Sequence, residues 1–405
     1  MGGRPPVVPG RPAHGRTHPA RGARSRGLSG LRIAVIGSRG IPANYGGFET
    51  FAEELCPRLV ELGHDVTVYC RKGYTGDYLL HEYKGVTLRY PPYLRNRQLE
   101  QLSHEAACIA DSLARKFDLY YFLGTRGAPL YVPLKLTRRI IVVNTDGLEW
   151  MRRKWSRLGR AYLKFAEWMA VRVAADELVS DARAMSAFFH RKYGRASTYL
   201  TNGAHVLTEL PAGALDEWSL EPGSYYLVAC RIEPENNIDI IIREFLASGS
   251  QRELVIAGGM NYRTPYWEHL TALGAGGRVR FLGPVYGDMR VEKLHLGCYA
   301  YLHGHEVGGT NPSLLKAMGC GNLAIALDTE FNSENLEGTG LLWEKRQGSL
   351  ADRIRWAEAN PQKVAELGRQ AQQRIRDHYT WDRIATAHDE FFRQVAARRR
   401  GFVSS

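Results

Sequence analysis

Apolar and polar residues follow one another along the chain in two successive series of short apolar runs and amphipathic stretches. The first series opens with LRIAVIG (31–37), a continuous apolar run typical of a buried parallel strand. A helical pattern interrupted by Pro57 follows, and Gly63 ends it. Further strand-like runs alternate with helical segments at 64–70, 118–124, 139–147 and 175–182. This alternation predicts a doubly wound α/β sheet.

The pattern restarts at SYYLVACRIEP (224–234), which is followed by a helical stretch and by strand-like runs at 253–259, 278–283, 299–304 and 322–328. A restart of this kind predicts a second α/β lobe, with a boundary near 204–224, where EWSLEPGS has the composition of a linker. Two amphipathic segments, 361–379 and 380–399, complete the chain, and we expect them to pack across both lobes.

Composition adds a basic tail to this picture. The chain of 405 residues has a net charge of +12, and its first 30 residues contain six arginines and no acidic residue. A segment with so few large apolar side chains cannot offset the entropy lost on ordering. We therefore predict four regions: a disordered tail 1–30, two Rossmann-like domains 31–205 and 206–375, and a C-terminal helix 376–400.

Other function classes are excluded by what the sequence lacks. Its six cysteines form no CxxC pair or Cys/His cluster, so we expect neither a metal site nor a disulfide framework. No run of about 18 apolar residues is present that could span a bilayer, and no nucleic-acid-binding module is recognisable. The sequence predicts a cytoplasmic protein that binds no nucleic acid.

The stretch HGHEVGGTNPSLLKAMGCGN has the pattern of a phosphate-binding turn before a helix. Gly308 and Gly309 allow the backbone to approach a ligand, and Thr310 or Asn311 can cap the helix. The free N–H groups near Ser313 would then point at an anion. The alternative is an ordinary strand, turn and capped helix.

Two further segments suggest contacts with such a ligand. In PANYGGFE, Gly46 and Gly47 can bring backbone amides to a sugar or its phosphate, although a simple tight turn is the alternative. Arg231 ends the first strand of the second lobe, where side chains point into the crevice of an open sheet and could pair with a diphosphate. The alternative for Arg231 is a surface pair with Glu233 or Glu235.

Four stretches in this order, GSRGIPANYGGFETFAEEL, NTDGLEWMRRKW, ACRIEPENN and HGHEVGGTNPSLLKAMGCGN, resemble GT-B glycosyltransferases of the family 4 type, in particular the bacterial rhamnosyltransferase-like group with a DUF1972-like N-terminal domain. The resemblance covers residues 31–390. It implies two Rossmann-like lobes facing a cleft, with a nucleotide sugar on the C-terminal lobe and an acceptor on the N-terminal lobe. The implied reaction transfers a sugar, such as rhamnose, to a glycan or lipid-linked acceptor in cell-surface polysaccharide synthesis, without a cofactor or metal.

The chain departs from this family pattern at two places. Relatives often carry a lysine five residues after the arginine of the first C-terminal strand, and here that residue is Asn236. They also carry two glutamates separated by seven residues, whose positions here are Gly308 and Lys316, while Glu306 stands two residues before the first. Lys316 could bind a phosphate or mark a weakened donor site.

The resemblance places a catalytic His or Asp near Asp146, which follows the run RIIVVNT. Asp146 could orient the acceptor hydroxyl or accept its proton, and burial could raise its pKa toward the working pH. Glu149 is the rival candidate for this role. For both residues the alternative is a turn or helix cap in NTDGLEW.

The segment RRKWSRLGRAYLKFAEW (152–168) interleaves basic residues with aromatic ones. Such a segment suits an anionic membrane surface or a lipid-diphosphate acceptor, so the protein could lie at the inner face of the membrane. The alternative is a solvated helix face whose aromatic residues lie in the core.

Two other functions remain open. One is a nucleotide-sugar-binding protein without turnover, suggested by Lys316. The other is an NADP-dependent oxidoreductase that uses the first βαβ unit. Its loop lacks the GxGxxG fingerprint, and its second strand ends in Cys70 and Arg71 rather than an acidic residue, although Arg71 and Lys72 could accept a 2′-phosphate.

Overall fold

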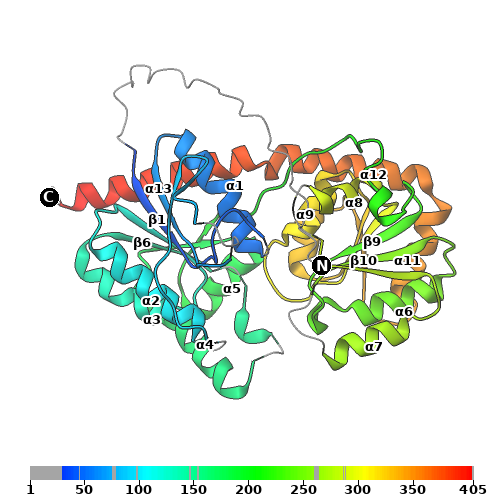
Figure 1. Ribbon diagram of the computed structural model, residues 1–405, viewed down its shortest axis with the longest axis horizontal. Helices are drawn as coiled ribbons and strands as arrows, with labels where there is room; N and C mark the ends of the chain where they lie inside the picture. Colours follow the sequence, from blue (N-terminus) through cyan, green and yellow to red (C-terminus); the bar gives the residue numbers. More distant parts are fainter. Residues whose placement is uncertain are drawn as a thin grey trace, which may run out of the picture.

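The computed structural model describes residues 30–44, 46–74, 79–96, 99–145, 147–152, 155–259, 264–285, 287 and 289–403. The predicted tail therefore lies, except for Gly30, outside the described residues, and so does Asp146. The described chain forms two α/β lobes side by side, each built on a largely parallel sheet (Figure 1). The predicted fold class is confirmed.

The N-terminal lobe contains an eight-stranded sheet in the order β3-β4-β2-β1-β5-β6-β7-β8, in which only the β3–β4 pair is antiparallel. Its strands are β1 (Arg32–Ile36), β2 (Asp65–Tyr69), β3 (Glu82–Tyr83), β4 (Val86–Arg89), β5 (Leu119–Leu123), β6 (Ile140–Asn144), β7 (Glu177–Ser180) and β8 (Thr198–Tyr199). Its helices are α1 (Gly47–Glu61), α2 (Glu100–Leu113), α3 (Ala128–Tyr131), η1 (Val132–Thr137), η2 (Glu149–Met151), α4 (Arg157–Met169), η3 (Ala170–Ala174) and α5 (Arg183–Tyr193).

The C-terminal lobe contains a six-stranded parallel sheet in the order β11-β10-β9-β12-β13-β14. Its strands are β9 (Tyr225–Ala229), β10 (Glu253–Ala257), β11 (Val279–Gly283), β12 (Ala300–His303), β13 (Ala324–Leu327) and β14 (Leu341–Trp343). The helices of this half are η4 (Asp216–Trp218), η5 (Pro234–Asn236), α6 (Ile238–Ser248), α7 (Pro265–Leu273), α8 (Arg290–Gly297), α9 (Pro312–Gly319), α10 (Glu330–Leu336), α11 (Ser349–Ala359), α12 (Pro361–Arg374) and η6 (Ile375–Tyr379), and α13 (Trp381–Val403) follows.

The central strands are buried on both faces because helices cover both sides of each sheet. All five residues of β5, and likewise of β6 and β9, are buried, which explains why these strands are continuous apolar runs in the sequence. In the N-terminal lobe, α1 and α13 cover one face, and α2, α3, η3 and α5 cover the other. This packing leaves the ends of the strands, with their loops, for a site.

Helix α13 returns to the N-terminal lobe after the chain has completed the C-terminal one, and it runs along that lobe as the orange to red helix (Figure 1). The crossing is fixed by a bridge between Ala204 and Thr380. Trp381 and Phe392 then pack against the side of the sheet that α1 covers. Both ends of the described chain thereby contribute to one lobe.

The elements differ from the sequence-based expectations in two respects. Helix α1 is not interrupted at Pro57 but continues through it to Glu61, since a proline removes one helical hydrogen bond without forcing the chain to leave the helix. Strands β3, β4, β8 and β14 were not predicted. They have two to four residues each, which is too short for a period of two to stand out.

Candidate functional site

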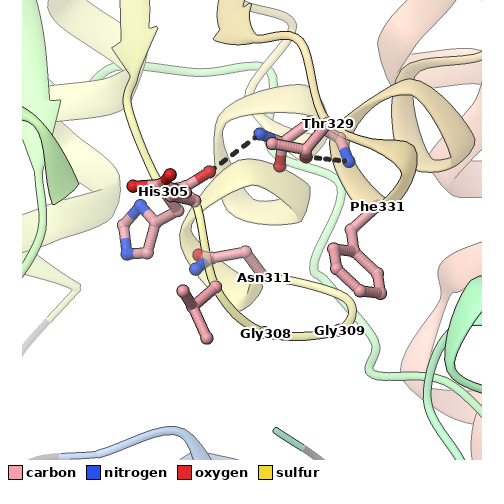
Figure 2. Close-up of a pocket in the computed structure, with 9 residues that line it drawn as sticks. His305, Gly308, Gly309, Asn311, Thr329 and Phe331 are labelled. Atoms are coloured by element: carbon pink, nitrogen blue, oxygen red, sulfur yellow. Dashed lines mark hydrogen bonds between the residues drawn. The ribbon is translucent and has the colours of Figure 1, made fainter. Parts of the chain in front are cut away.

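The turn between β12 and α9 forms one wall of a pocket on the C-terminal lobe. Figure 2 shows His305 and Phe331 on opposite sides of this pocket, with Asn311 between them. Asn332 fixes the far wall, because its Nδ2 donates to the His305 carbonyl at 3.1 Å and its backbone N–H to Thr329 Oγ1 at 3.1 Å. The lining consists of His305, Glu306, Val307, Gly308, Gly309, Asn311, Thr329, Phe331 and Asn332.

The start of α9 matches the predicted phosphate-binding geometry. Asn311 is the cap, and its Oδ1 accepts a hydrogen bond from the backbone N–H of Ser313 at 2.9 Å. A Cβ added to Gly47, the first residue of α1, would lie 3.8 Å from Pro312 Cγ. The N-termini of α1 and α9 therefore meet across the two lobes, and both present the positive end of a helix dipole there.

Gly309 and Thr310 join the two lobes. A Cβ on Gly309 would lie 1.9 Å from Oδ1 of Asp181, a buried residue that follows β7. Thr310 Oγ1 donates to the Asp181 carbonyl at 2.6 Å, and Asn202 Nδ2 donates to the Thr310 carbonyl at 3.3 Å. A side chain at 309 would displace the buried Asp181 carboxylate, while Gly308, with φ of 140°, supplies the backbone angle that the turn needs.

Arg231 lies at the C-terminal end of β9, next to the glycine turn. The side-chain amide of Asn236 donates to the Arg231 carbonyl at 2.7 Å, and the Glu306 N–H donates to the Glu235 carbonyl at 3.1 Å. Among the described residues no carboxylate forms an ion pair with Arg231, so neither of the pairs considered from the sequence is present. Asn236 is buried and holds the loop instead of lining the pocket.

Burial and basic side chains from both lobes lower the pKa of His305. Burial lowers the pKa of His305 well below 6.5, and the neighbouring His303, Arg231 and Arg152 lower it further. The rings of His303 and His305 stack with their centroids 4.4 Å apart, and burial also lowers the pKa of His303 to about 3. The imidazoles are therefore neutral, and the positive charge beside the pocket comes from guanidinium groups.

Two charged residues of the predicted site on the C-terminal lobe are engaged in ion pairs. Lys316 Nζ lies 2.6 Å from Glu292 Oε1 on α8, and Lys345 Nζ lies 2.6 Å from Glu306 Oε2. Burial opposes ionisation of Glu292, but the nearby Lys316 ammonium outweighs it and lowers the pKa of Glu292. Glu306 lines the pocket, whereas Lys316 does not.

In the N-terminal lobe, the loop before α1 is shaped by Glu49. Its Oε1 accepts from the backbone N–H of Arg39 at 2.8 Å, and burial raises the pKa of Glu49. A Cβ on Gly46 would lie 2.0 Å from Glu49 Oε2, and Gly46 has φ of 117°. A glycine at 46 is thus favoured by the close approach of Glu49 and by the positive φ, whereas a side chain at 47 would make an ordinary contact with Pro312 at the lobe interface.

Glu149 lies between two guanidinium groups. Its Oε2 accepts from Arg126 Nη2 at 3.0 Å and from Trp155 Nε1 at 3.3 Å, and its Oε1 lies 2.9 Å from Arg152 Nε. This geometry suits a residue that positions Arg126 and Arg152.

The network continues to residues that the sequence did not suggest. Arg126 Nη1 donates to Gln101 Oε1, and Gln101 Nε2 donates to Glu105 Oε1 at 2.9 Å. Burial raises the pKa of Glu105, whose other oxygen accepts from Tyr131 at 2.9 Å. The available signal was the run EQLSHEAACIAD, in which the polar residues His104 and Glu105 lie on the buried face of α2.

Arg71 is held in the N-terminal lobe by an ion pair with Glu100 of α2. Its side chain is almost fully buried, and Nη1 lies 2.8 Å from Glu100 Oε1. A guanidinium already paired in this way is poorly placed to select a nucleotide 2′-phosphate, which the oxidoreductase alternative would need.

Two facing Rossmann-like lobes, with a glycine turn and a capped helix on the second, define a GT-B fold protein. Residues 31–205 match the family described as "Domain of unknown function (DUF1972)", and residues 219–374 match "Glycosyl transferases group 1". The chain thus consists of a DUF1972 domain followed by a domain of the glycosyl transferases group 1 family. These matches confirm the predicted GT-B glycosyltransferase with a DUF1972-like N-terminal domain, while the rhamnosyltransferase-like group stays a prediction.

Solved structures agree with this assignment of the fold. The chain is similar to sucrose-phosphate synthase from Thermosynechococcus elongatus, with a TM-score of 0.76, 18% identity, and coverage of 91% of this chain and 100% of that chain. It is also similar to Anabaena HepE in complex with UDP, with a TM-score of 0.72, 18% identity and coverage of 90% and 100%. For WaaG, described as a glycosyltransferase involved in lipopolysaccharide biosynthesis, the TM-score is 0.68, the identity 14% and the coverage 89% and 99%. A search of curated proteins gives no significant match.

Proposed function

We propose that the protein transfers a sugar from a nucleotide diphosphate sugar to a glycan or lipid-linked acceptor. The observation that carries the proposal is the convergence of the N-termini of α1 and α9 beside Arg231 and the glycine turn. Helix N-termini and an arginine together favour a diphosphate over a neutral ligand. The complexes of Anabaena HepE with UDP and with UDP-glucose support a nucleotide-sugar donor in the same fold.

In the proposed reaction, an acceptor hydroxyl oxygen forms a bond to the anomeric carbon, and the bond from that carbon to the diphosphate breaks. Arg231 and the backbone amides near Ser313 stabilise the negative charge that develops on the departing diphosphate. Because these groups supply positive charge and donors without a metal, we propose that catalysis is metal-independent. The hydroxyl proton passes to a base, for which Asp146 is our candidate, and Glu149 positions the arginines beside the acceptor.

The finer assignment is a hexosyltransferase of cell-surface polysaccharide synthesis in the cytoplasm, with rhamnose as the transferred sugar. It rests on the sequence resemblance to the rhamnosyltransferase-like group. The pocket beside the glycine turn would hold the sugar, and Phe331 and Val307 supply apolar surface there, which suits the methyl group of a deoxyhexose.

A second candidate is a protein that binds the nucleotide sugar without transferring it. The observation in its favour is Lys316, whose ammonium is paired with Glu292 and lies outside the pocket lining. In that case donor binding would persist, and no sugar would reach any acceptor.

The test is a thermal-shift screen of the purified chain with UDP-, GDP- and dTDP-sugars, and with NADPH as the comparison. A ligand at 100 times its Kd adds about 2.7 kcal/mol of stability, so a true donor gives a clear rise in Tm. Release of the nucleoside diphosphate with the selected donor and membrane-extracted acceptors then measures transfer, with and without EDTA. Stabilisation without release favours the binding protein, stabilisation by NADPH alone favours the oxidoreductase, and no stabilisation by any sugar nucleotide contradicts both donor-binding proposals.

A further inference from the structure

Helix α4 has apolar side chains on two opposite faces. Leu163, Ala166 and Ala170 beyond its end are buried against the lobe. On the outer face, Leu158 is 82% exposed, Phe165 49% and Trp168 44%. Packing in the core therefore explains the apolar character of the inner face only. The aromatic residues Phe165 and Trp168 do not lie in the core.

The outer apolar residues form one continuous stripe. Leu158, Ala161, Phe165 and Trp168 follow the spacing of three and four residues that places side chains on one helix face. The rings of Phe165 and Trp168 stack with centroids 6.1 Å apart. Single exposed apolar residues are ordinary on a protein surface, but a stripe with stacked aromatic rings is typical of an interaction site.

The charges that surround this stripe have one sign. Arg157, Arg160, Lys164 and Arg172 are exposed beside it. Glu167 is the one acidic residue between 155 and 173, and it is buried. Its oxygens accept hydrogen bonds from Trp150 Nε1 at 2.8 Å, Lys192 Nζ at 2.6 Å and the Tyr193 hydroxyl at 2.6 Å. The face that α4 presents to solvent thus combines an apolar stripe with basic residues beside it.

A bilayer surface with anionic headgroups complements this pattern. Such a helix lies in the interface with its apolar residues among the acyl chains and its basic residues among the headgroups. Within the described residues no helix is both long and apolar enough to cross a membrane, so α4 can lie on a bilayer but not span it. Figure 1 shows α4 at the lower end of the N-terminal lobe, whereas α13 runs along the upper side.

We propose that the outer face of α4 docks the protein on a bilayer that contains anionic phospholipids. The α4 region is also connected to the proposed acceptor edge, because the Tyr162 hydroxyl donates to the Arg126 carbonyl at 2.9 Å and Trp155 contacts Glu149. A docked α4 would hold that edge next to the membrane. The docking suits the lipid-linked acceptor of the proposed function, but it stands on the exposed residues of α4 alone.

The experiment is co-sedimentation of the full chain with vesicles of phosphatidylcholine, alone or with about one third phosphatidylglycerol. We expect at least about 10-fold stronger partitioning to the anionic vesicles, with a loss on added salt. Phe165→Ser with Trp168→Ser should reduce this partitioning about 10-fold or more, whereas Leu113→Ser, which removes a 43% exposed leucine from α2, should leave it unchanged.

Charge is tested with a matched pair of triple variants. Arg157→Gln, Arg160→Gln and Lys164→Gln together should weaken binding to anionic vesicles about 10-fold or more. The control is Arg346→Gln, Lys363→Gln and Arg369→Gln, which removes the same charge from exposed positions of the C-terminal lobe. Equal effects of the two triple variants, or binding that survives both sets of α4 changes, overturns the proposal and assigns membrane binding to another part such as the basic tail.

The donor screen of the proposed function serves as the folding control. If the α4 variants keep the wild-type thermal shift with the donor but lose vesicle binding, the docking surface is supported. If the wild type binds no sugar nucleotide and still requires α4 for vesicle binding, the docking surface stands and the proposed function falls.

Discussion

The two lobes present different chemistry at the edges that face each other. On the C-terminal lobe the site is made from three short segments, residues 231–237, 303–316 and 329–332, and its main features are a glycine turn, a capped helix and Arg231. On the N-terminal lobe it is a network of side chains from a loop and two helices, in which Arg126 is connected by hydrogen bonds to Gln101 of α2 and Glu149 of η2. Backbone recognition suits a phosphate that all donors share, whereas a side-chain network can be adapted to a particular acceptor.

The largest expected effect comes from the point where the lobes touch. Gly309→Ala places a Cβ 1.9 Å from Asp181 Oδ1, and because both residues are buried, either the Asp181 carboxylate or the contact between the lobes must move. We expect a loss of kcat/KM of about 100-fold or more, since displacements of about 1 Å can cost this much, together with a lower Tm. The control is Gly276→Ala, whose Cβ would meet no atom within 4 Å. Wild-type transfer by Gly309→Ala would show that the contact with Asp181 is not needed.

The second-largest effect is expected from removing Arg231, the main positive charge at the C-terminal edge. Arg231→Ala should lower kcat by about 100-fold, the cost of losing one group that stabilises developing negative charge. Its Tm without ligand should stay near that of the wild type, because Arg231 has no ion pair among the described residues. Arg243→Ala, which removes a half-exposed arginine of α6, is the control. If Arg231→Ala and Arg243→Ala have the same kcat, the diphosphate does not contact Arg231.

A smaller change should follow when the N-terminal network is weakened. Glu149→Gln keeps the size of the side chain but removes the charge that holds Arg126 and Arg152. We expect about a 10-fold higher KM for the acceptor, with little change in kcat or its pH profile. Asp146→Asn should instead lower kcat. Glu366→Gln, on a surface pair with Lys363, controls for the loss of a carboxylate. A lost kcat and an altered pH profile in Glu149→Gln would make Glu149 the base.

The smallest expected effect concerns Lys316 and Glu292. Lys316→Glu brings two carboxylates together and should cost about 1–2 kcal/mol of stability, which Glu292→Lys in the same chain should restore.

The pKa of Glu292 is lowered from 4.5 in the folded protein. The ionised form therefore stabilises the fold above this pH, and the stability is lost as the pH falls through the lower folded value. Chemical denaturation of the wild type and of Lys316→Met should show a difference at neutral pH that disappears in acid. A difference that persists in acid would contradict this pairing.

The sequence predicted the fold and the geometry of the glycine turn and helix cap well, because both depend on local patterns. Buried parallel strands are continuous apolar runs, so β9 and β12 could be predicted from the sequence. A glycine turn before a capped helix is a short motif, so the cap at Asn311 could be predicted as well. The role of Asn236 could not be predicted from the sequence. Its amide was considered as a ligand for phosphate, but η5 turns it inward to the Arg231 carbonyl.

The side-chain network of the N-terminal lobe was harder to predict because its residues lie far apart in the chain. Arg126 is 23 residues from Glu149 and 25 from Gln101, and no local pattern specifies such pairs. For a related reason, the sequence did not decide which face of α4 is exposed to solvent. Its sequence carries apolar residues on both faces, and only the packing of Leu163 and Ala166 shows which one is covered.

Hydrogen exchange with and without the stabilising sugar nucleotide tests the donor site most directly. If the donor binds at the C-terminal edge, amides in 303–316 and 231–237 become protected, the amides near Ser313 most strongly, and Arg231→Ala weakens this protection. Protection confined to the loop between β1 and α1, with 303–316 unchanged, would contradict the donor site and with it the proposed glycosyltransferase mechanism.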